Sequence, residues 1–265
     1  MNKDTCKLLA VDVDGTILNS AHQLTDPVCS ALQQLSAQGI HVILNSARSP
    51  ASMGRFTDRI GLQEMIVALN GALVLDAHGK PCHRTPMAVS AITTILSLSR
   101  YHNVTANLFT GFDWYVEKMD DLVQNQMNTV AFAPTVGILP NAVLAHIEKI
   151  LVRGDLAAMQ AFHQQLTQQN LSLATSFSKP TFCEITAAGV SKATGLRYVC
   201  DTLAISADEV VAIGDNFNDV AMLEFAGYGV AMGNAPEGVQ AIADEVIGHH
   251  NADGVADFVE AFFLS

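Results

Sequence analysis

The chain has 265 residues, of which 49% are hydrophobic and 15% are charged, so it can bury a sizeable core and is not a disordered protein. Lys and Arg number 14 against 26 Asp and Glu, and the net charge of −12 argues against binding to nucleic acid or to an anionic membrane surface. This length suits either one large domain or two unequal domains.

The cysteine pattern and the apolar runs bear on the location of the protein. The cysteines are Cys6, Cys29, Cys82, Cys183 and Cys200. Their odd number, their wide spacing and the lack of a C-x-x-C pair argue against a disulfide framework or a zinc site, and favour a reducing compartment. The N-terminal sequence MNKDTCKLLAVDVDG has too short an apolar run for a signal peptide, and no stretch approaches the about 20 apolar residues of a membrane helix. We therefore expect a cytoplasmic protein.

Predicted strands and helices alternate in the first part of the chain, which is typical of βαβ units in a mainly parallel sheet. A helix begins near Asp26, which we expect to cap it, with Pro27 at the first helical position. The predicted elements are a strand at 7–13, the helix from Asp26 to Gly39, a strand at 40–44, a helix at 50–60, a strand at 65–69, and a hairpin through Asn70–Gly71 into 72–75.

The middle of the chain, 81–189, has a different pattern, with helices followed by paired strands. The predicted elements are a helix at 89–101, strands at 104–109, 114–117 and 147–152, a helix at 156–168, and strands at 171–175 and 181–186. This pattern favours an α+β domain with an antiparallel sheet. We interpret 81–189 as an inserted domain and 1–80 with 190–265 as the core domain.

The last part of the chain returns to alternating strands and helices. The predicted elements are helices at 191–203, 217–226 and 236–243, strands at 209–213, 228–232 and 246–247, and a helix from Asp253 onward. The predicted fold class is therefore α/β, with a Rossmann-like parallel sheet as the core and the α+β domain inserted into it.

Polar residues and glycines follow four of the predicted core strands, where an open parallel sheet forms its sites. Asp12 and Asp14 follow the first strand at a spacing of two, so in an extended segment both carboxylates point the same way. Such a pair repels unless a cation or a shared proton intervenes. Gly15 lets the backbone approach closely, while the alternative is a pair of solvated turn acids.

A second acidic group lies in the stretch GDNFND. Asp215 and Asp219 are four residues apart, and if a helix begins near Asn216 both face one side of its first turn. Carboxylate and amide oxygens are the hard ligands that suit Mg²⁺. The alternative is a cluster that caps the helix N-terminus, which accounts for one acid but not for a second acidic group at the same sheet edge.

Lys192 and Ser46 are candidates for binding an anion. Lys192 lies at the start of a predicted helix, where the helix dipole disfavours a cation, so a nearby anion must offset it. Ser46 would add a hydroxyl donor, although it could also be a simple turn serine. Arg48 could bind an anion or form a structural salt bridge. A carboxylate nucleophile, a cation, Lys192 and a second acid are the parts that phosphoryl transfer through an aspartyl-phosphate requires.

The four groups resemble the motifs of the haloacid dehalogenase superfamily phosphatases. The matching stretches are DVDGT at 12–16, Ser46 in NSAR, Lys192 in GVSKATGL and GDNFNDVAML at 214–223. The Cof-type branch, with a large inserted cap, is the most similar, because the chain also has NG at 70–71, MGNA at 232–235 and NADGVA at 251–256. The resemblance covers the whole chain in order and spacing.

The resemblance implies a role for each motif residue. It implies that Asp12 is the nucleophile and Asp14 the general acid and base, and that Ser46, Lys192 and Asn218 hold the transferring phosphate, with Gly15 beside it. It implies that Mg²⁺ is bound by the Asp12 carboxylate, the backbone carbonyl of Asp14 and Asp215, with Asp219 in support through water.

The sequence departs from the family pattern at two positions. Ser46-Ala47-Arg48 stands where relatives have T-G-R, so the hydroxyl is kept but the glycine is lost. Phe217 stands where many relatives have a small or acidic residue, and it could narrow the site or pack against the cap. Cap residues are expected to select the substrate, and the candidates are Asn107, Trp114, Tyr115, Arg153 and Lys179, with Trp114 and Tyr115 expected to pack inside the cap.

We predict a Mg²⁺-dependent phosphatase of small phosphorylated metabolites, such as sugar phosphates, that acts as a monomer or small homo-oligomer. The alternatives are a phosphotransferase or phosphomutase, a receiver-type signalling domain phosphorylated on Asp, and a sensor of phosphorylated ligands without catalysis. A receiver domain needs no insertion of this size, and a sensor needs no complete set of motif residues.

Overall fold

The computed structural model describes residues 5–130 and 132–264. The chain divides into two compact units. The core unit comprises the chain up to Arg48, Met53–His83 and the chain from Ser191 onward. The inserted unit comprises Arg84–Val190 together with the short stretch Ser49–Ser52.

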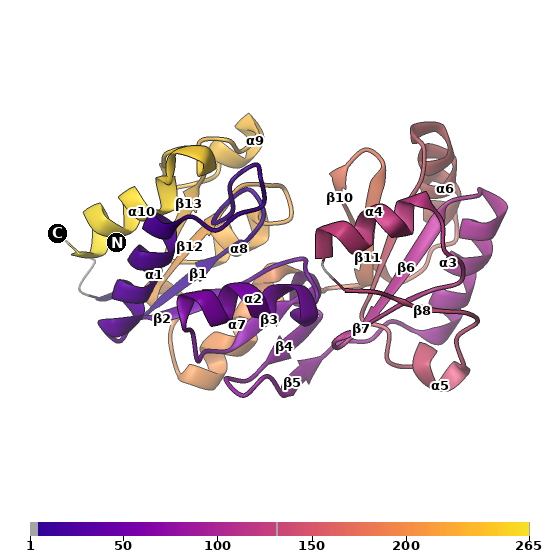
Figure 1. The fold of residues 1–265 in the computed structure, drawn as a ribbon, viewed down its shortest axis with the longest axis horizontal. Coiled ribbons are helices and arrows are strands. Elements are labelled where there is room, and N and C mark those ends of the chain that lie inside the picture. Colours follow the sequence, from indigo (N-terminus) through magenta and orange to yellow (C-terminus); the bar gives the residue numbers. More distant parts are fainter. Residues whose placement is uncertain (1–4, 131, 265) are drawn as a thin grey trace. The chain divides into compact units, whose positions relative to one another are not determined.

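The core unit is built on a parallel sheet with the strand order β14-β13-β12-β1-β2 (Figure 1). Its strands are β1 (Leu8–Val11), β2 (His41–Leu44), β12 (Val210–Gly214), β13 (Tyr228–Ala231) and β14 (Glu245–Val246). The register aligns Val11 with both Ile213 and Leu44, so three neighbouring strands end at one edge of the sheet. The predicted α/β class with a Rossmann-like parallel sheet is confirmed.

Helices cover the core sheet, whose strands are nearly continuous runs of buried apolar residues. Leu8 and Ala10 share one hydrophobic cluster with side chains of α7 (Lys192–Leu203) and α8 (Val220–Phe225). Helices α1 (Asp26–Ala37) and α10 (Gly254–Val259) pack against each other. Helix α2 (Pro50–Ile60) belongs to the core unit from Met53 onward. The remaining helical segments are short: η3 (Ala207–Glu209), α9 (Glu237–Gln240), η4 (His250–Ala252) and the π-helical η5 (Glu260–Leu264).

Two helix starts in the core unit differ from the prediction. The N-cap of α1 is Thr25, and Asp26 is its first residue. The segment that was predicted to be helical from 217 forms a turn first, and α8 begins only at Val220. The turn forms because the Asp219 side chain accepts hydrogen bonds from backbone N–H groups of the preceding residues, which a spacing rule for helices does not include.

A small antiparallel sheet follows β2 along the chain. It consists of β3 (Ile66–Ala68), β4 (Leu73–Leu75) and β5 (Pro81–Arg84), in that order. The predicted hairpin is present, with Val67 opposite Val74 and the turn η2 (Leu69–Gly71) between the strands. Strand β5 was not predicted, because its mostly exposed residues have no apolar alternation.

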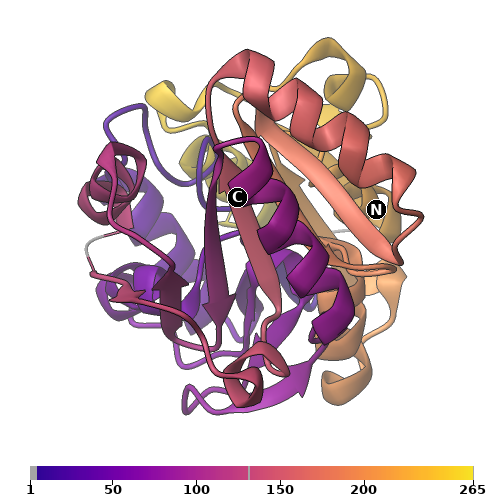
Figure 2. The ribbon, with the colours of Figure 1, turned by 90° about the vertical axis from the view of Figure 1, so that its right-hand side faces the viewer.

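The inserted unit contains a separate sheet with the order β10-β11-β9-β6-β7-β8, antiparallel except for the β7–β8 pair. Its strands are β6 (Thr105–Thr110), β7 (Asp113–Val116), β8 (Thr135–Val136), β9 (Lys149–Arg153), β10 (Leu173–Lys179) and β11 (Phe182–Ala187). Helices α3 (Val89–Tyr101) and α6 (Leu156–Gln168) cover one face (Figure 2). The predicted α+β character is confirmed.

Three short elements of the inserted unit were not predicted: α4 (Asp121–Val130), β8 and α5 (Asn141–Leu144). Helix α4 has the sequence DLVQNQMNTV, which contains too few apolar residues to show a helical period. Both residues of β8 are exposed. Such segments are held by tertiary contacts and carry no periodic signal of their own.

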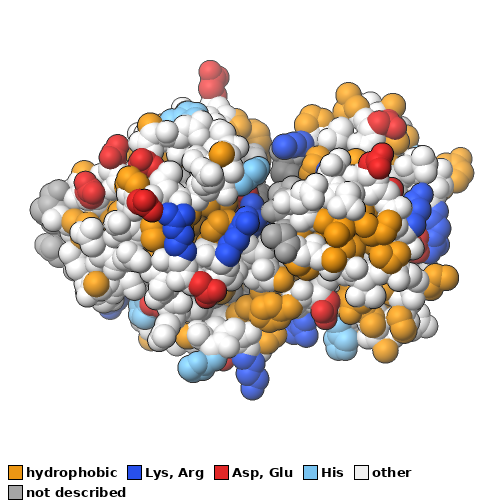
Figure 3. All heavy atoms as spheres, viewed as in Figure 1, with side chains coloured by type: hydrophobic (Ala, Val, Ile, Leu, Met, Phe, Trp, Pro, Cys, Tyr) orange, Lys and Arg blue, Asp and Glu red, His pale blue; other side chains and the backbone are white. Residues whose placement is uncertain are grey.

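Three further features are the distribution of acidic side chains on the surface, the length of the helices and the state of the cysteines. On the face shown in Figure 3, acidic side chains are spread over both units. None of the helices in the described part of the chain is long and apolar enough to cross a membrane. The cysteines are free thiols, and all except the exposed Cys82 are buried.

Candidate active site

Asp12 directly follows β1, which lies between β12 and β2 in the core sheet. Its backbone N–H continues the parallel ladder to the carbonyl of Ile213 at 3.0 Å, so the backbone places the carboxylate. The side chain of Val13 is fully buried, and Asp12 itself is only 5% exposed. The chain turns away after the two acids at Gly15, where φ is +80°. Asp12 and Asp14 do not share their partners, because Asp12 contacts Lys192 and Asp14 contacts Arg48.

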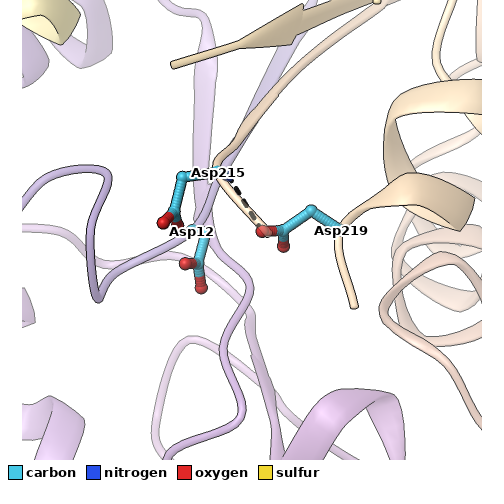
Figure 4. Close-up of side chains that lie close together, drawn as sticks. All are labelled: Asp12, Asp215 and Asp219. Atoms are coloured by element: carbon cyan, nitrogen blue, oxygen red, sulfur yellow. Dashed lines mark hydrogen bonds between the residues drawn. The ribbon is translucent and has the colours of Figure 1, made fainter. Parts of the chain in front are cut away.

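Asp215 and Asp219 are brought to Asp12 by the turn after β12 (Figure 4). Asp219 accepts hydrogen bonds at Oδ2 from the backbone N–H groups of Asp215 and Asn216, both at 3.0 Å. A Cβ at Gly214 would lie 2.5 Å from the Asp219 side chain, so this turn needs glycine there. The structure therefore brings the two predicted acidic groups together.

Lys192 joins these two groups through one buried ammonium. Its Nζ lies 2.5 Å from Asp12 Oδ1 and 2.5 Å from Asp219 Oδ1. Burial alone would lower the pKa of Lys192, but the charges of Asp12 and Asp219 outweigh it and raise that pKa well above its usual range. The two carboxylates thus offset the unfavourable position of a cation in the first turn of α7, whose N-cap is Ser191.

The site nevertheless has more negative than positive charge. Burial raises the pKa of Asp12 well above its usual range, with Asp219 and Asp215 adding to the effect and Lys192 opposing it. Burial, together with the charge of Asp219, raises the pKa of Asp215 to about 6. Both shifts mean that the surroundings disfavour the charged carboxylates unless a further cation is present.

These residues fit a divalent cation with oxygen ligands. Asp12, Asp215 and Asp219 can each bring one carboxylate oxygen within 4.8 Å of the others. Asp219 accepts three hydrogen bonds, one from Lys192 and two from backbone N–H groups. Asp215 accepts one at each oxygen, so Asp12 and Asp215 are the better donors to a cation. A hard divalent ion would supply the missing positive charge. The assignment of these residues as metal ligands stays a prediction.

Asp14 has a different set of partners. Arg48 donates to it from both Nε and Nη2 at 2.6 Å, and His22 Nδ1 lies 3.4 Å from Oδ1. Burial alone would raise the pKa of Asp14, but the hydrogen bonds from Arg48 and His22 outweigh it and hold that pKa well below its usual range. Arg48 therefore forms the salt bridge that the sequence had left as one of two possibilities.

His22 was not predicted from the sequence. It sits in a turn closed by the hydrogen bond from its own N–H to the carbonyl of Asn19, and its φ is +55°. A left-handed backbone is uncommon for such a residue and is typical of sites where the surroundings impose the geometry. A lone histidine in a polar loop carries no sequence signal for this contact.

Ser46 and its neighbours end strand β2. Ser46 is buried, and its Oγ accepts a hydrogen bond from the backbone N–H of Arg48 at 3.2 Å. Asn45 Nδ2 donates to the carbonyl of Lys192 at 3.0 Å and so ties β2 to the first turn of α7. Ala47 is not among the described residues with positive φ, so the backbone at this position does not require the glycine of the family pattern.

Asn218 lies against the turn after β3. Its Nδ2 is 3.3 Å from Asn70 Oδ1. Leu69, Asn70 and Gly71 have φ values of +53°, +59° and +92°. Consecutive left-handed residues are strained, and this turn was predicted only as a simple hairpin. The ring of Phe217 is 61% exposed and lies beside Gly238.

Two partners of Asp215 complete the site. Thr16 Oγ1 donates to Asp215 Oδ1 at 3.1 Å, and Asn234 Nδ2 lies 3.4 Å from Oδ2. A Cβ at Gly15 would lie 2.3 Å from that carboxylate, so Gly15 makes room for it. Thr16 and Asn234 belong to the sequence motifs DVDGT and MGNA, but the motifs did not predict that both residues contact Asp215.

The substrate candidates in the inserted unit differ in exposure. Asn107, Trp114 and Arg153 are buried, and the first two bond to each other, with Trp114 Nε1 3.1 Å from Asn107 Oδ1. Arg153 donates to the carbonyl of Leu122 at 2.9 Å. These side chains hold the unit together. Tyr115 is half-buried and packs against the hydrophobic cluster of the inserted unit, as expected, whereas Lys179 is exposed.

The fold and the site define an α/β enzyme whose carboxylates and lysine meet at the carboxyl edge of a parallel sheet. The model of the haloacid dehalogenase-like hydrolase family matches residues 9–259, so the chain belongs to this family.

Named relatives narrow the class. The chain is 27% identical over 259 residues to 5-amino-6-(5-phospho-D-ribitylamino)uracil phosphatase YcsE of Bacillus subtilis, covering 97% of this chain and 96% of the relative. It is 28% identical over 276 residues to pyridoxal phosphate phosphatase YbhA of Escherichia coli, covering 98% and 100%. A crystal structure of a haloacid dehalogenase-like hydrolase from Bacteroides thetaiotaomicron matches with a TM-score of 0.88 and 26% identity, covering 97% of this chain and 100% of that one. The protein is a Cof-type phosphatase of this family.

Proposed function

We propose that the protein hydrolyses small phosphorylated metabolites with Mg²⁺ as its cofactor and Asp12 as its nucleophile. The observation that carries the proposal is the buried contact between Asp12 and Lys192 at the end of β1. A carboxylate can attack an anionic phosphate only where positive charge is supplied. Mg²⁺, bound by Asp12, the Asp14 backbone carbonyl and Asp215 with Asp219 in support, would add positive charge to that of Lys192.

The reaction proceeds in two halves. In the first, an oxygen of Asp12 bonds to phosphorus while the bond from phosphorus to the leaving oxygen breaks, and Asp14 gives that oxygen a proton. In the second, Asp14 takes a proton from water, the water oxygen bonds to phosphorus, and the bond to Asp12 breaks to release inorganic phosphate. Ser46, Lys192 and Asn218 hold the phosphate through both halves.

The surroundings of Asp14 bear on this division of roles. Its pair with Arg48 favours the carboxylate, which is the form that the second half needs. The first half needs the protonated form, so the pair has to open before the leaving group takes its proton. Because the Asp14 side chain is 42% exposed while that of Arg48 is 8% exposed, Asp14 is the partner with room to move.

The substrate is proposed as a small phosphomonoester. By their names, the two relatives act on a phosphorylated ribitylaminouracil and on pyridoxal phosphate, which are different small phosphomonoesters. Sugar phosphates belong to the same chemical class and are included in the proposal. We further propose that the inserted unit is the cap that selects the substrate, with Tyr115 and Lys179 as candidates, and that the protein is a cytoplasmic monomer or small homo-oligomer.

A phosphate-release assay tests the proposal. The purified protein is screened with p-nitrophenyl phosphate and a panel of phosphorylated metabolites, with Mg²⁺ or with EDTA. We expect release that requires Mg²⁺, that is lost in Asp12→Asn and that is kept in Asp58→Asn, a matched change at an exposed position of α2. Full activity in EDTA or in Asp12→Asn would refute the mechanism, and release that needs an added alcohol acceptor would favour a phosphotransferase.

A further inference from the structure

Asn234, in the loop after β13, connects three separate segments of the core unit. Its Nδ2 donates to the carbonyl of Gly15 at 2.9 Å and lies 3.4 Å from Asp215 Oδ2. Its Oδ1 accepts from the backbone N–H of His250 at 3.0 Å. One amide therefore links the loop after β1, the carboxylate after β12 and the C-terminal segment.

The chemistry of these contacts requires an amide. The two N–H bonds face a carbonyl and a carboxylate, which are both acceptors, and the oxygen faces a donor. An aspartate of the same shape at this position would place a carboxylate against Asp215 and could not donate to Gly15.

The loop that carries Asn234 is itself held in place. Gln240 Nε2 donates to the carbonyls of Gly233 at 3.2 Å and of Ala235 at 2.8 Å, on either side of Asn234. The N–H of Gly233 lies 3.3 Å from the carbonyl of Gly248, and a Cβ at Gly233 would lie 2.8 Å from the carbonyl of Ile247. The backbone around Asn234 is therefore fixed by contacts that do not involve its side chain.

The Asp215 carboxylate is held at both oxygens, by Thr16 at Oδ1 and by Asn234 at Oδ2. We propose that Asn234 is a positioning residue for the binding of a divalent cation. It orients the Asp215 carboxylate and fixes the peptide group between Gly15 and Thr16. Hydrogen-bond partners of metal-binding carboxylates hold them in the binding orientation, and loss of such partners typically lowers metal affinity about 10–100-fold. This inference rests on the proposed function, because that function assigns Asp215 to the cation.

Direct measurement of metal binding tests the inference. Binding of Mg²⁺ to the substrate-free protein is measured by calorimetry for the wild type, Asn234→Ala and Asn234→Leu, the second of which keeps the branched shape of the side chain without its polar atoms. The control is Asn141→Ala, at an exposed position of the inserted unit. We expect both Asn234 variants to bind Mg²⁺ at least about 10-fold more weakly, and the control to bind like the wild type.

Two further readouts separate positioning from a general structural effect. Thermal unfolding without metal should stay cooperative in the Asn234 variants, because backbone contacts fix the loop, while the lost hydrogen bonds to Gly15 and His250 should lower the midpoint. High Mg²⁺ concentrations should restore kcat of the Asn234 variants with KM for the phosphomonoester unchanged. Unchanged Mg²⁺ affinity in folded Asn234 variants would overturn the inference alone. A wild type that binds no Mg²⁺ would instead overturn the proposed function, and the inference with it.

Discussion

Two acids separated by one residue have opposite electrostatic surroundings in this protein. Asp12 is buried with Lys192 on one side and Asp215 and Asp219 nearby, and its pKa is raised. Asp14 is held by Arg48, and its pKa is lowered. Pairs of titratable groups whose surroundings push their pKa values apart are typical of sites where one acts as nucleophile and the other exchanges protons.

Removal of the Asp14 carboxylate should separate the two halves of the reaction. p-Nitrophenolate leaves without needing a proton, so Asp14→Asn should still transfer the phosphoryl group from p-nitrophenyl phosphate but should be slow to hydrolyse the enzyme intermediate. We expect a burst of p-nitrophenol of up to one equivalent in stopped-flow absorbance, and a steady-state rate reduced by about 10²–10⁴-fold. Alkyl phosphates should show no burst. A steady-state rate equal to that of the wild type would contradict the role of Asp14.

Glu209 supplies a prediction for stability as a function of pH. Hydrogen bonds from Lys7 and then from Ser206 lower the pKa of Glu209 to about 2 from 4.5. A lowered pKa in the folded state stabilises the protein above the unfolded pKa, and this contribution is lost as the pH falls from about 4.5 to about 2.

The free energy of unfolding of Glu209→Gln should therefore be lower than that of the wild type at neutral pH, and the difference should shrink through this pH range. Circular dichroism during denaturant unfolding at a series of pH values measures it. Glu224→Gln, at an exposed position of α8, serves as the control. A difference between wild type and Glu209→Gln that does not change with pH would count against the assigned contacts.

At the scale of elements, the position of α7 decides where Lys192 lies. The turn η2 and the first residues of α7 are in close contact: a Cβ at Gly71 would lie 2.0 Å from the carbonyl of Ser191. A Cβ at Gly195 would lie 2.4 Å from a methyl group of Val67. Two glycines thus allow the helix that carries Lys192 to approach β3 and η2.

A matched pair of glycine variants tests this contact. Gly71→Ala and Gly79→Ala both place a side chain at positive φ, at +92° and +75°, but only the first has atoms within 4 Å of the new Cβ. Both should lose about 1–2 kcal/mol from the backbone strain. Gly71→Ala should lose about 1–3 kcal/mol more from overpacking, and also phosphatase activity, because α7 must shift. Equal denaturation midpoints and activities for the two variants would contradict the proposed packing.

The elements that the sequence predicts well are those with strong local patterns. The apolar run before Asp12 predicts β1, and the alternation of strands and helices predicts the parallel sheet. The polar residues after each strand then predict that Asp12, Ser46 and Asp215 meet at one edge, as observed. Segments without periodic apolar residues, such as α4 and β8, are held by tertiary contacts and carry no comparable pattern.

The contacts between loops are what the sequence does not predict. The spacing of Asp215 and Asp219 suggests a helical turn, but backbone donors form a loop around Asp219 instead. The contacts of His22 with Asp14 and of Asn234 with Asp215 join residues from separate loops. Such contacts depend on the tertiary structure. A sequence motif identifies a residue but not the residue that it contacts.

At the scale of the whole molecule, each unit has a hydrophobic core of its own. In the inserted unit, α3 and α6 pack against the antiparallel sheet through buried residues such as Ile95, Leu108 and Phe162. The core unit packs α7 and α8 on its parallel sheet around residues such as Leu196 and Met222. Separate cores are typical of units that fold as domains.

The segment Arg84–Val190, produced alone, should therefore fold. We expect a dispersed amide spectrum in NMR and a cooperative thermal transition for this segment, because its core does not draw on the rest of the chain. The Phe162→Ala variant of this segment, which loses a fully buried ring, should unfold at a lower temperature than the unmodified segment. A non-cooperative, poorly dispersed segment would show that the inserted unit depends on the core unit for its fold.

The central claim is that the phosphoryl group passes through Asp12. It is tested most directly by reduction of the enzyme with borohydride during turnover of p-nitrophenyl phosphate in Asp14→Asn, in which the intermediate should accumulate. Borohydride converts an aspartyl-phosphate to homoserine, which peptide mass spectrometry locates in the chain. The account predicts homoserine at position 12, formed only with substrate and Mg²⁺ and absent from Asp12→Asn. Homoserine at another aspartate, or phosphate release with no modified residue 12, would contradict it.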